Sequence, residues 1–442
     1  MRRLLLLALA VPALAACDRP VVDLGGPRVE VVRPASLDVA QPGPSLDLAL
    51  RADVFGTIDS VTVNRQRLAF DAGLGVYQAD IPLAPGLNVL TVDVYAAERT
   101  GSDTLYAFRA ALAPVTIPVS GSPAPVAGAA VSTLDAGDAL LSGGAGSTGA
   151  ARSTGTRISL VGGVLSYERV ELAAARAQHS STLLPDGRVL LVGGVSTDAA
   201  GSRRLAGTAE VVDPATNAST PVPVVDRVTG APVTIGRAGH VARGLTVDGI
   251  FVLYVYGGRD DRDAPSNTFD VFRWDDGTLV RLSPPLGTGG GGFPAFSAPV
   301  IVSVPPRGVF EASSAVFGLS PDDEAPTALR FDWLAATSPT YPFDLEARRA
   351  TPLADPRSGA AALAVDGFAL VSGGTLANGT VAGTFEAYVP SADRAFRFGD
   401  AVRLRTPRTD HSATLLPDGR ILIVGGRDAS GTALFSPEAF QL

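Results

Sequence analysis

The sequence has one cysteine, no lysine and no run of basic residues. A single cysteine, Cys17, excludes a disulfide within the chain and a metal site built from several cysteine ligands. The formal net charge is −8, and the arginines are scattered along the chain. This charge argues against a partner with a phosphate backbone, so nucleic acid is not expected as a ligand.

Long apolar runs are equally scarce, because residues 4–16 form the only marked one. This run follows Met1-Arg2-Arg3 and ends in Leu14-Ala15-Ala16-Cys17, which is the layout of a secretory signal and is too short for a stable membrane span. Small residues directly before a cysteine resemble the lipobox of bacterial lipoproteins. The resemblance implies removal of residues 1–16, acylation of Cys17 and a membrane anchor in the bacterial cell envelope, at the inner or outer membrane. An ordinary cleaved signal peptide is the alternative.

Aromatic residues make up only 6% of the chain, whereas there are 49 glycines and 34 prolines. So many turn-forming residues favour short strands over helices, and we expect an all-β protein. A chain of this length normally forms more than one domain. Residues 17–26 have no apolar periodicity and are expected to tether the folded part to the lipid.

Residues 27–114 alternate apolar with polar or small side chains in several short segments, including 28–31, 46–50, 61–63 and 90–94. This period of two is typical of half-buried strands, and glycine and proline between the segments supply the turns. The region resembles small bacterial immunoglobulin-like domains around 61–64, 76–83 and 85–88. A β-sandwich is therefore expected, acting as a spacer or carrying a ligand site on its loops.

Residues 115–442 contain an internal repeat, clearest where 176–194 aligns with 408–426. Both copies have Arg-x-x-His, a Leu-Pro-Asp-Gly-Arg turn and a pair of glycines. Weaker copies end in glycine pairs at 143–144, 257–258 and 373–374, and the copy that ends at Phe317-Gly318 is interpreted as lacking the first glycine. These landmarks recur every 50 to 64 residues, which is the spacing of repeats with four short strands each.

The repeats resemble kelch repeats of the bacterial form shared with the central domain of galactose oxidase. The resemblance depends on the Arg-x-x-His opening, the turn, the glycine pair and a third strand such as 208–214. It implies a six-bladed kelch-type β-propeller over 115–442. Because an open ring leaves strand edges unpaired, we expect Val115–Val119 to complete the last blade by pairing near Ala433–Phe435.

Arginine and histidine recur at matching repeat positions, since each of the three histidines follows an arginine by three residues. In one interpretation these side chains hydrogen-bond across adjacent blades and stabilise the ring. In the other they gather at one rim of the channel and bind an anionic or other ligand. The six candidates are Arg176, His179, Arg237, His240, Arg408 and His411.

Other motifs predict no cofactor and no catalytic centre. The copper site of galactose oxidase needs a cysteine-linked tyrosine, and this sequence has no cysteine left for it, so the resemblance extends only to the scaffold. The acidic segment Asp260–Asp263 lacks the alternating spacing of a calcium loop and is expected to be a solvated loop. The glycine run 289–292 has no following helix or lysine and is expected to be a linker.

Two classes of function remain open. The favoured one is a cell-envelope lipoprotein that binds a protein or glycan through the propeller loops or the channel mouth. The alternative is an envelope enzyme acting on glycans, which would need two facing carboxylates. Acidic residues such as Asp135, Asp248 and Asp366 recur at turn positions, which explains them without catalysis.

Overall fold

The computed structural model describes residues 28–53, 57–97, 99–197, 202–247, 249–282, 293–320, 327–335 and 343–442. They divide into two compact units. Unit 1 contains residues 47–81 and 89–105 together with the described residues up to Ala35, and unit 2 contains 36–46, 82–88 and everything from Tyr106 onward. Every regular element is a strand, which confirms the all-β prediction, and no helix of the described ranges could cross a membrane.

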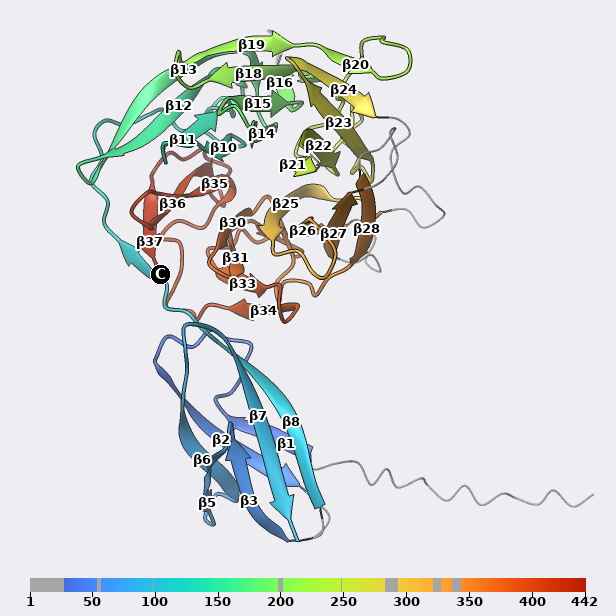
Figure 1. The fold of residues 1–442 in the computed structure, drawn as a ribbon. Coiled ribbons are helices and arrows are strands. Elements are labelled where there is room, and N and C mark those ends of the chain that lie inside the picture. The colour runs from blue at the N-terminus through green and yellow to red at the C-terminus, as the bar shows by residue number, and fades with distance from the viewer. Residues whose placement is uncertain are drawn as a thin grey trace, which may run out of the picture. The chain divides into compact units, whose positions relative to one another are not determined.

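Two four-stranded sheets account for the first eight strands (Figure 1). Alternate side chains of their central strands are buried, such as Leu48 and Leu50 on one sheet and Val61 and Val63 on the other, as the period of two predicts. In spatial order, one sheet consists of β1 (Arg28–Arg33), β2 (Ser45–Asp53), β6 (Val76–Pro82) and β5 (Ala69–Asp71), and the other of β4 (Gln66–Arg67), β3 (Ile58–Val63), β7 (Gly86–Ala96) and β8 (Arg99–Arg109).

Six further sheets, numbered here one to six along the chain, lie in the described part of unit 2. Sheet one comprises β10 (Ala130–Thr133), β11 (Ala139–Ser142), β12 (Arg152–Val161) and β13 (Val164–Arg176). Sheet two comprises β14 (Ser180–Leu183), β15 (Val189–Val192), β18 (Ala209–Asp213) and β19 (Ala218–Val222). Sheet three comprises β21 (Val241–Val247), β22 (Ile250–Tyr256), β23 (Phe269–Asp275) and β24 (Thr278–Leu282), and the parallel strand β20 (Val224–Asp226) flanks β24.

Sheet four comprises β25 (Ser297–Val304), β26 (Ala312–Leu319), β27 (Ala328–Ala335) and β28 (Phe343–Arg349). Sheet five comprises β30 (Ala361–Val365), β31 (Phe368–Ser372), β33 (Phe385–Val389) and β34 (Arg394–Arg397). Sheet six comprises β35 (Thr409–Leu415), β36 (Ile421–Arg427), β37 (Glu438–Gln441) and β9 (Ala113–Val115). Two short pairs accompany them, β16 (Val195–Thr197) with β17 (Arg203–Leu205) and β29 (Arg357–Ser358) with β32 (Thr375–Leu376).

The six sheets surround a common centre (Figure 1). Their first strands contact one another in cyclic order, β10 to β14, β21, β25, β30, β35 and back to β10. A buried apolar cluster lies between each neighbouring pair, including sheets six and one, where Val424 and Phe435 pack with Leu141 and Ile158. This arrangement of small antiparallel sheets is consistent with a β-propeller.

The Pro-Asp-Gly turn joins the first two strands of a sheet for a local reason. Between β14 and β15, the amide of Gly187 donates to the carbonyl of Leu184 at 3.0 Å, and Gly187 has φ +83°. The Asp186 carboxylate accepts from the amide of Arg188 at 3.0 Å. Glycine supplies the positive φ and aspartate closes the turn, so the motif predicts a hairpin.

The ring closes with a strand from before the repeats, as predicted, but this strand is Ala113–Val115 and includes only the first residue of the predicted Val115–Val119. Val115 of β9 pairs with Ala439, and β9 forms the fourth strand of sheet six. The predicted partner Ala433–Phe435 was wrong, because Ala433 bridges to Arg427 instead, and Val119 bridges to Leu165 of sheet one. The third strand of the last sheet begins at Glu438, five residues after the start of the predicted segment at Ala433.

The glycine landmark of sheet four also needs correction. The first glycine of a pair donates its amide to the carbonyl of a threonine that precedes the third strand, as Gly193 does to Thr208 at 3.1 Å. Gly318 makes the same bond to Thr327 at 3.0 Å. Gly318 is therefore the first glycine of its repeat, and Leu319 replaces the second.

Candidate functional site

Four buried arginines occupy the same repeat position, just before the first strand of a sheet, and each binds a carboxylate on the third strand of that sheet. Sheets two, three, five and six contain them, and the pairs are Arg176 with Glu210, Arg237 with Asp270, Arg357 with Glu386, and Arg408 with Glu438. We call these four pairs the arginine clamps. The sequence repeat predicted three of the arginines and missed Arg357, because the residue three positions later is Ala360 and not histidine.

The clamp of sheet two shows how each pair is satisfied. Arg176 donates from Nε to Glu210 Oε1 at 2.6 Å and from Nη1 to the carbonyl of Gly193 at 2.9 Å. The other oxygen of Glu210 accepts from the amide of Ala173 at 2.6 Å and from Ser219 Oγ at 2.7 Å. Both charged side chains are about 1% exposed, so their charges are paired and hydrogen-bonded inside the protein.

Each clamp arginine that opens an Arg-x-x-His repeat also bonds to the preceding sheet through its backbone. The carbonyl of Arg176 accepts from the amide of Gly144 at 2.8 Å, and that of Arg408 accepts from Gly374 at 2.9 Å. A Cβ on Gly143 would lie 2.3 Å from the Arg176 carbonyl oxygen, at φ +56°. The glycine pair is therefore required for the close approach of neighbouring sheets.

The three histidines bridge to the sheet before their own. The Nε2 atoms of His179 and His411 lie 2.8 Å and 2.9 Å from the hydroxyls of Ser142 and Ser372, which directly precede glycine pairs. In sheet two this position is Val192, and His240 instead lies 3.0 Å from the Ser180 hydroxyl. These contacts agree with the interpretation that the repeat side chains link adjacent sheets.

The buried imidazoles are held neutral. Burial, followed by the charge of the neighbouring arginine, lowers the pKa of His240 and of His411 to about 3 and that of His179 well below its usual value. All six predicted rim residues are at most 6% exposed. Their use as a ligand rim stays a prediction, and in the structure each has partners within the protein.

A ring of backbone hydrogen bonds links the first strands at the position just before the histidine. The residue at this position has positive φ in all six sheets, between +46° at Ala298 and +64° at Gly128. Five bonds of 2.6 to 2.9 Å join neighbours, each amide donating to the carbonyl of the residue at this position in an adjacent sheet. We call this ring the amide belt; its members are Gly128, Gln178, Gly239, Ala298, Gly359 and Asp410.

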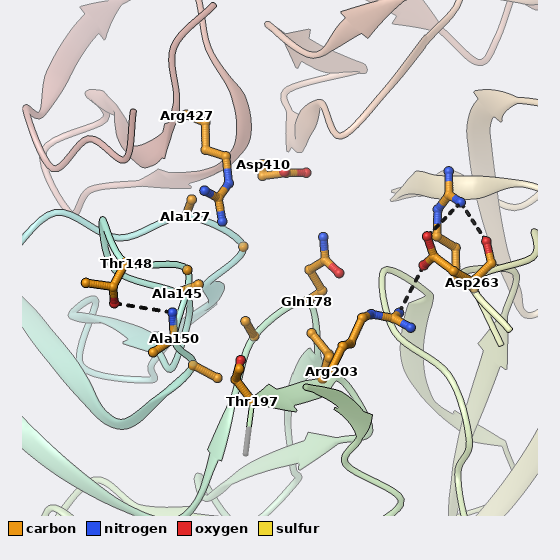
Figure 2. Close-up of a pocket in the computed structure, with 16 residues that line it drawn as sticks. Ala127, Ala145, Thr148, Ala150, Gln178, Thr197, Arg203, Asp263, Asp410 and Arg427 are labelled. Atoms are coloured by element: carbon orange, nitrogen blue, oxygen red, sulfur yellow. Dashed lines mark hydrogen bonds and ion pairs between the residues drawn. The ribbon is translucent and has the colours of Figure 1, made fainter. Parts of the chain in front are cut away.

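A polar pocket of about 720 Å³ lies over the amide belt. Belt residues Gly128, Gln178 and Asp410 contribute to it, together with residues that follow glycine pairs, such as Arg259 and Arg427. Figure 2 shows Gln178, Asp410 and Arg427 around one open space, with the Arg203–Asp263 ion pair to one side. We call it the mouth pocket, and its size is within the range of small-ligand sites.

Charges in the mouth pocket are only partly matched by one another. Asp263 pairs with Arg203 at 3.4 Å and with Arg259 at 3.6 Å. Arg427 forms no ion pair within the described ranges. Burial raises the pKa of Asp410, and the charge of Arg427 acts in the opposite direction. Within the described ranges, the guanidinium of Arg427 and the carboxyl of Asp410 thus have no hydrogen-bonded partner, although the charge of Arg427 acts on Asp410.

Other predicted features have ordinary structural roles or lie outside the described residues. Asp260 closes its own loop by accepting from the amides of Arg262 and Ala264, both at 2.9 Å, while Asp263 lines the mouth pocket. Asp135 and Asp366 occupy turns. Cys17, Asp248 and the glycine run 289–292 are not among the described residues.

The repeat signal predicted the buried side chains better than the exposed ones. Gln178 and Asp410 occupy the variable positions of Arg-x-x-His, where the repeat conserves backbone conformation and not side-chain type. Arg259 and Arg427 both follow a glycine pair directly, so the matching Gly-Gly-Arg segments were a usable signal. The predicted site residues do not include the side chains at these positions.

Comparisons with known proteins support the fold. No family model matches the chain, and no curated protein matches it. Among solved structures, the chain is similar to one described as "Structure of YjhT", a kelch-type protein, with 14% identity and a TM-score of 0.52. The match covers 73% of this chain and 96% of the other. At this identity the likeness shows a shared propeller-like fold and nothing about the ligand.

Proposed function

We propose that this chain is a lipid-anchored binding protein of the bacterial cell envelope, with the mouth pocket as its ligand site. Unit 2 is then a six-bladed kelch-type propeller that presents the pocket to a protein or glycan. Unit 1 is an immunoglobulin-like sandwich that acts as a spacer. The cyclic contacts of the six first strands and the two four-stranded sheets of unit 1 support this architecture.

The observation that carries the proposal is the set of polar side chains available in the mouth pocket. Gln178, Asp410 and Arg427 make no side-chain hydrogen bond or ion pair with other residues in the described ranges, and they face one open space (Figure 2). Together they offer donors and acceptors that a ligand can satisfy. In contrast, the four clamp arginines already form ion pairs with carboxylates inside the protein.

Binding is favoured over glycan hydrolysis by the chemistry of the innermost strands. These strands have mainly small, hydroxyl and aliphatic side chains, and Asp410 is the one acidic residue among them. The other carboxylate of the mouth pocket, Asp263, is engaged by two arginines. Hydrolysis of a glycosidic bond by the usual route needs two carboxyl groups placed on either side of the bond, one of them an acid and the other a base or nucleophile.

Site-specific photo-crosslinking in intact cell envelopes tests the proposed site. A photoreactive phenylalanine analogue replaces Thr197 at the mouth pocket or, as a control, Val161, which is 66% exposed at the β12–β13 turn. We expect a discrete adduct from position 197 and none from 161. Adding Arg427→Ala should abolish the adduct. A position-197 adduct that persists in this variant, or no adduct at all, would contradict the site.

The membrane anchor is tested separately. Cys17→Ala removes the acylated thiol, and the exported variant should move from the membrane fraction to the soluble fraction after a salt wash, because no other lipid attachment is proposed. Cys17→Ala protein that remains with membranes after the wash would overturn the anchor without affecting the mouth pocket.

A further inference from the structure

A second pocket lies wholly within unit 1, at one edge of the two sheets. It has a volume of about 820 Å³ and is formed by the start of β3, by β4 and β5, and by Gly75 and Tyr77 beside them. Its main side chains are Ile58, Asp59, Arg67, Phe70 and Tyr77. We call it the sandwich groove.

An aromatic pair forms the apolar part of the sandwich groove. Phe70 of β5 pairs across the strands with Tyr77 of β6, with ring centroids 4.8 Å apart. Phe70 is nevertheless 58% exposed, because β5 is a three-residue edge strand with no further neighbour in its sheet. A ring supported on one side only presents its electron-rich face to an apolar C–H surface of a ligand.

The polar rim of the groove is electrically balanced. It has one acidic and one basic side chain, Asp59 and Arg67, with the hydroxyls of Thr57 and Ser60 beside them. Arg67 Nη2 donates to the backbone carbonyl of Asp59 at 3.2 Å, which holds the guanidinium at the rim and leaves the Asp59 carboxylate unused by that bond. A neutral ligand rich in hydroxyls can donate to the carboxylate and accept from the guanidinium without an unmatched charge.

We propose that the sandwich groove binds a neutral pyranoside chain, with a sugar ring stacked on Phe70 and its hydroxyls bonded to Asp59 and Arg67. A pyranose ring has an apolar C–H face and a hydroxylated edge, which match the aromatic floor and the polar rim. An extended peptide added to β5 would gain few backbone hydrogen bonds, since this edge is three residues long. The site is independent of the mouth pocket, and unit 1 becomes a glycan-binding module as well as a spacer.

Titration of the full chain with cellohexaose and with chitohexaose, followed by saturation-transfer NMR and calorimetry, tests the proposal. We expect saturable binding of at least one of these neutral oligosaccharides. Phe70→Ala should weaken it about ten-fold, the scale of one lost aromatic contact, and Arg67→Ala should weaken it less. Val89→Ala is the matched control, because Val89 is also an exposed apolar residue of unit 1, at 51%, and lies outside the groove.

Circular dichroism verifies that each variant is folded, and both substitutions alter exposed side chains, so the fold should be retained. Two results would overturn the proposal: no saturable binding of either oligosaccharide to the parent chain, or equal affinity of the parent and Phe70→Ala. Stronger binding of an acidic oligosaccharide such as tetragalacturonate would also overturn it, because the balanced rim favours a neutral chain.

Discussion

Sheets two and four fill the same repeat positions differently, sheet two with a charged pair and sheet four with two apolar side chains. In sheet two, Arg176 and Glu210 form a buried clamp, whereas the matching positions of sheet four are Phe296 and Leu329. Near Phe296, aromatic rings of sheets three and four pack together, and the centroids of contacting rings are at most 6.2 Å apart. These rings include Tyr254, Tyr256, Phe269, Phe331 and Trp333. Both members of the charged pair are replaced together, and the backbone contact is retained.

The backbone bond at this position is common to both solutions. The amide of the second glycine in one sheet donates to the carbonyl of the arginine position in the next, and Gly258 donates to Phe296 at 2.8 Å as Gly144 does to Arg176. At the ring closure, Gly426 donates to Val126 at 2.8 Å. The difference teaches that apolar side chains can replace the charged clamp where the backbone bond is kept and the volume beside it is filled, so charge is required only where a carboxylate has already been buried.

The largest expected effect is the loss of one member of a clamp. Arg176→Ala leaves the Glu210 carboxylate buried without its cation and should lower the free energy of unfolding by about 3 to 5 kcal/mol. The control is Arg169→Ala on the same strand, whose ion pair with Glu171 is exposed to solvent and should contribute little to stability. Urea unfolding followed by circular dichroism measures both. Similar losses in the two variants would mean that burial does not distinguish these pairs.

A smaller net effect is expected when a clamp is converted to the apolar solution of sheet four. In sheet three, Arg237→Phe combined with Asp270→Leu removes both charges at once and should leave the free energy of unfolding within about 1 kcal/mol of the parent. Each single substitution should cost more, and the double-mutant cycle measures the coupling. If the double variant were as unstable as the sum of its singles, the two solutions would not be interchangeable.

The most gradual expected effect, spread over several pH units, is the acid sensitivity of the histidine bridges. An unfolded histidine titrates near pH 6.5, whereas the pKa of His411 is about 3 in the folded chain, so the unfolded state binds more protons between these values. Stability is therefore lost as the pH falls through this window, by up to about 1.4 kcal/mol per pH unit for each histidine. His411→Gln can keep the bond to Ser372 and should reduce the slope measured by unfolding at pH 4 to 6. An unchanged slope would show that His411 is not shielded in the folded chain.

The sequence predicted what the repeat demands of the backbone and the core. The glycine pairs, the Pro-Asp-Gly turns and the three Arg-x-x-His segments have the same local structure in each copy, so the pattern of residues was sufficient. The sequence pattern did not predict Arg357, because its repeat lacks the histidine, although the Arg357–Glu386 clamp is as buried as the others. The register of ring closure was missed because β9 and β37 carry no repeat motif.

The candidate site was less predictable, because a ligand site depends on where the repeats differ. Gln178 and Asp410 share a positive φ with the four other residues of the amide belt, but they are the belt residues that place a polar side chain in the mouth pocket. Arg203 comes from the short β16–β17 pair, which has no equivalent in the repeat pattern. Which of these side chains meet depends on the closed ring and cannot be obtained from spacing along the chain.

The pairing of β9 with β37 has a consequence for the order in which the protein is made. Val115 can pair only after its partner Ala439, in β37, has been synthesised, so sheet six acquires its fourth strand late. During synthesis, therefore, five sheets can form from neighbouring segments while the ring stays open. The final step joins the two most distant parts of the ring and bears the entropic cost of closing its longest loop. Folding of the ring should then be a late, all-or-none event that is completed when β9 pairs with β37.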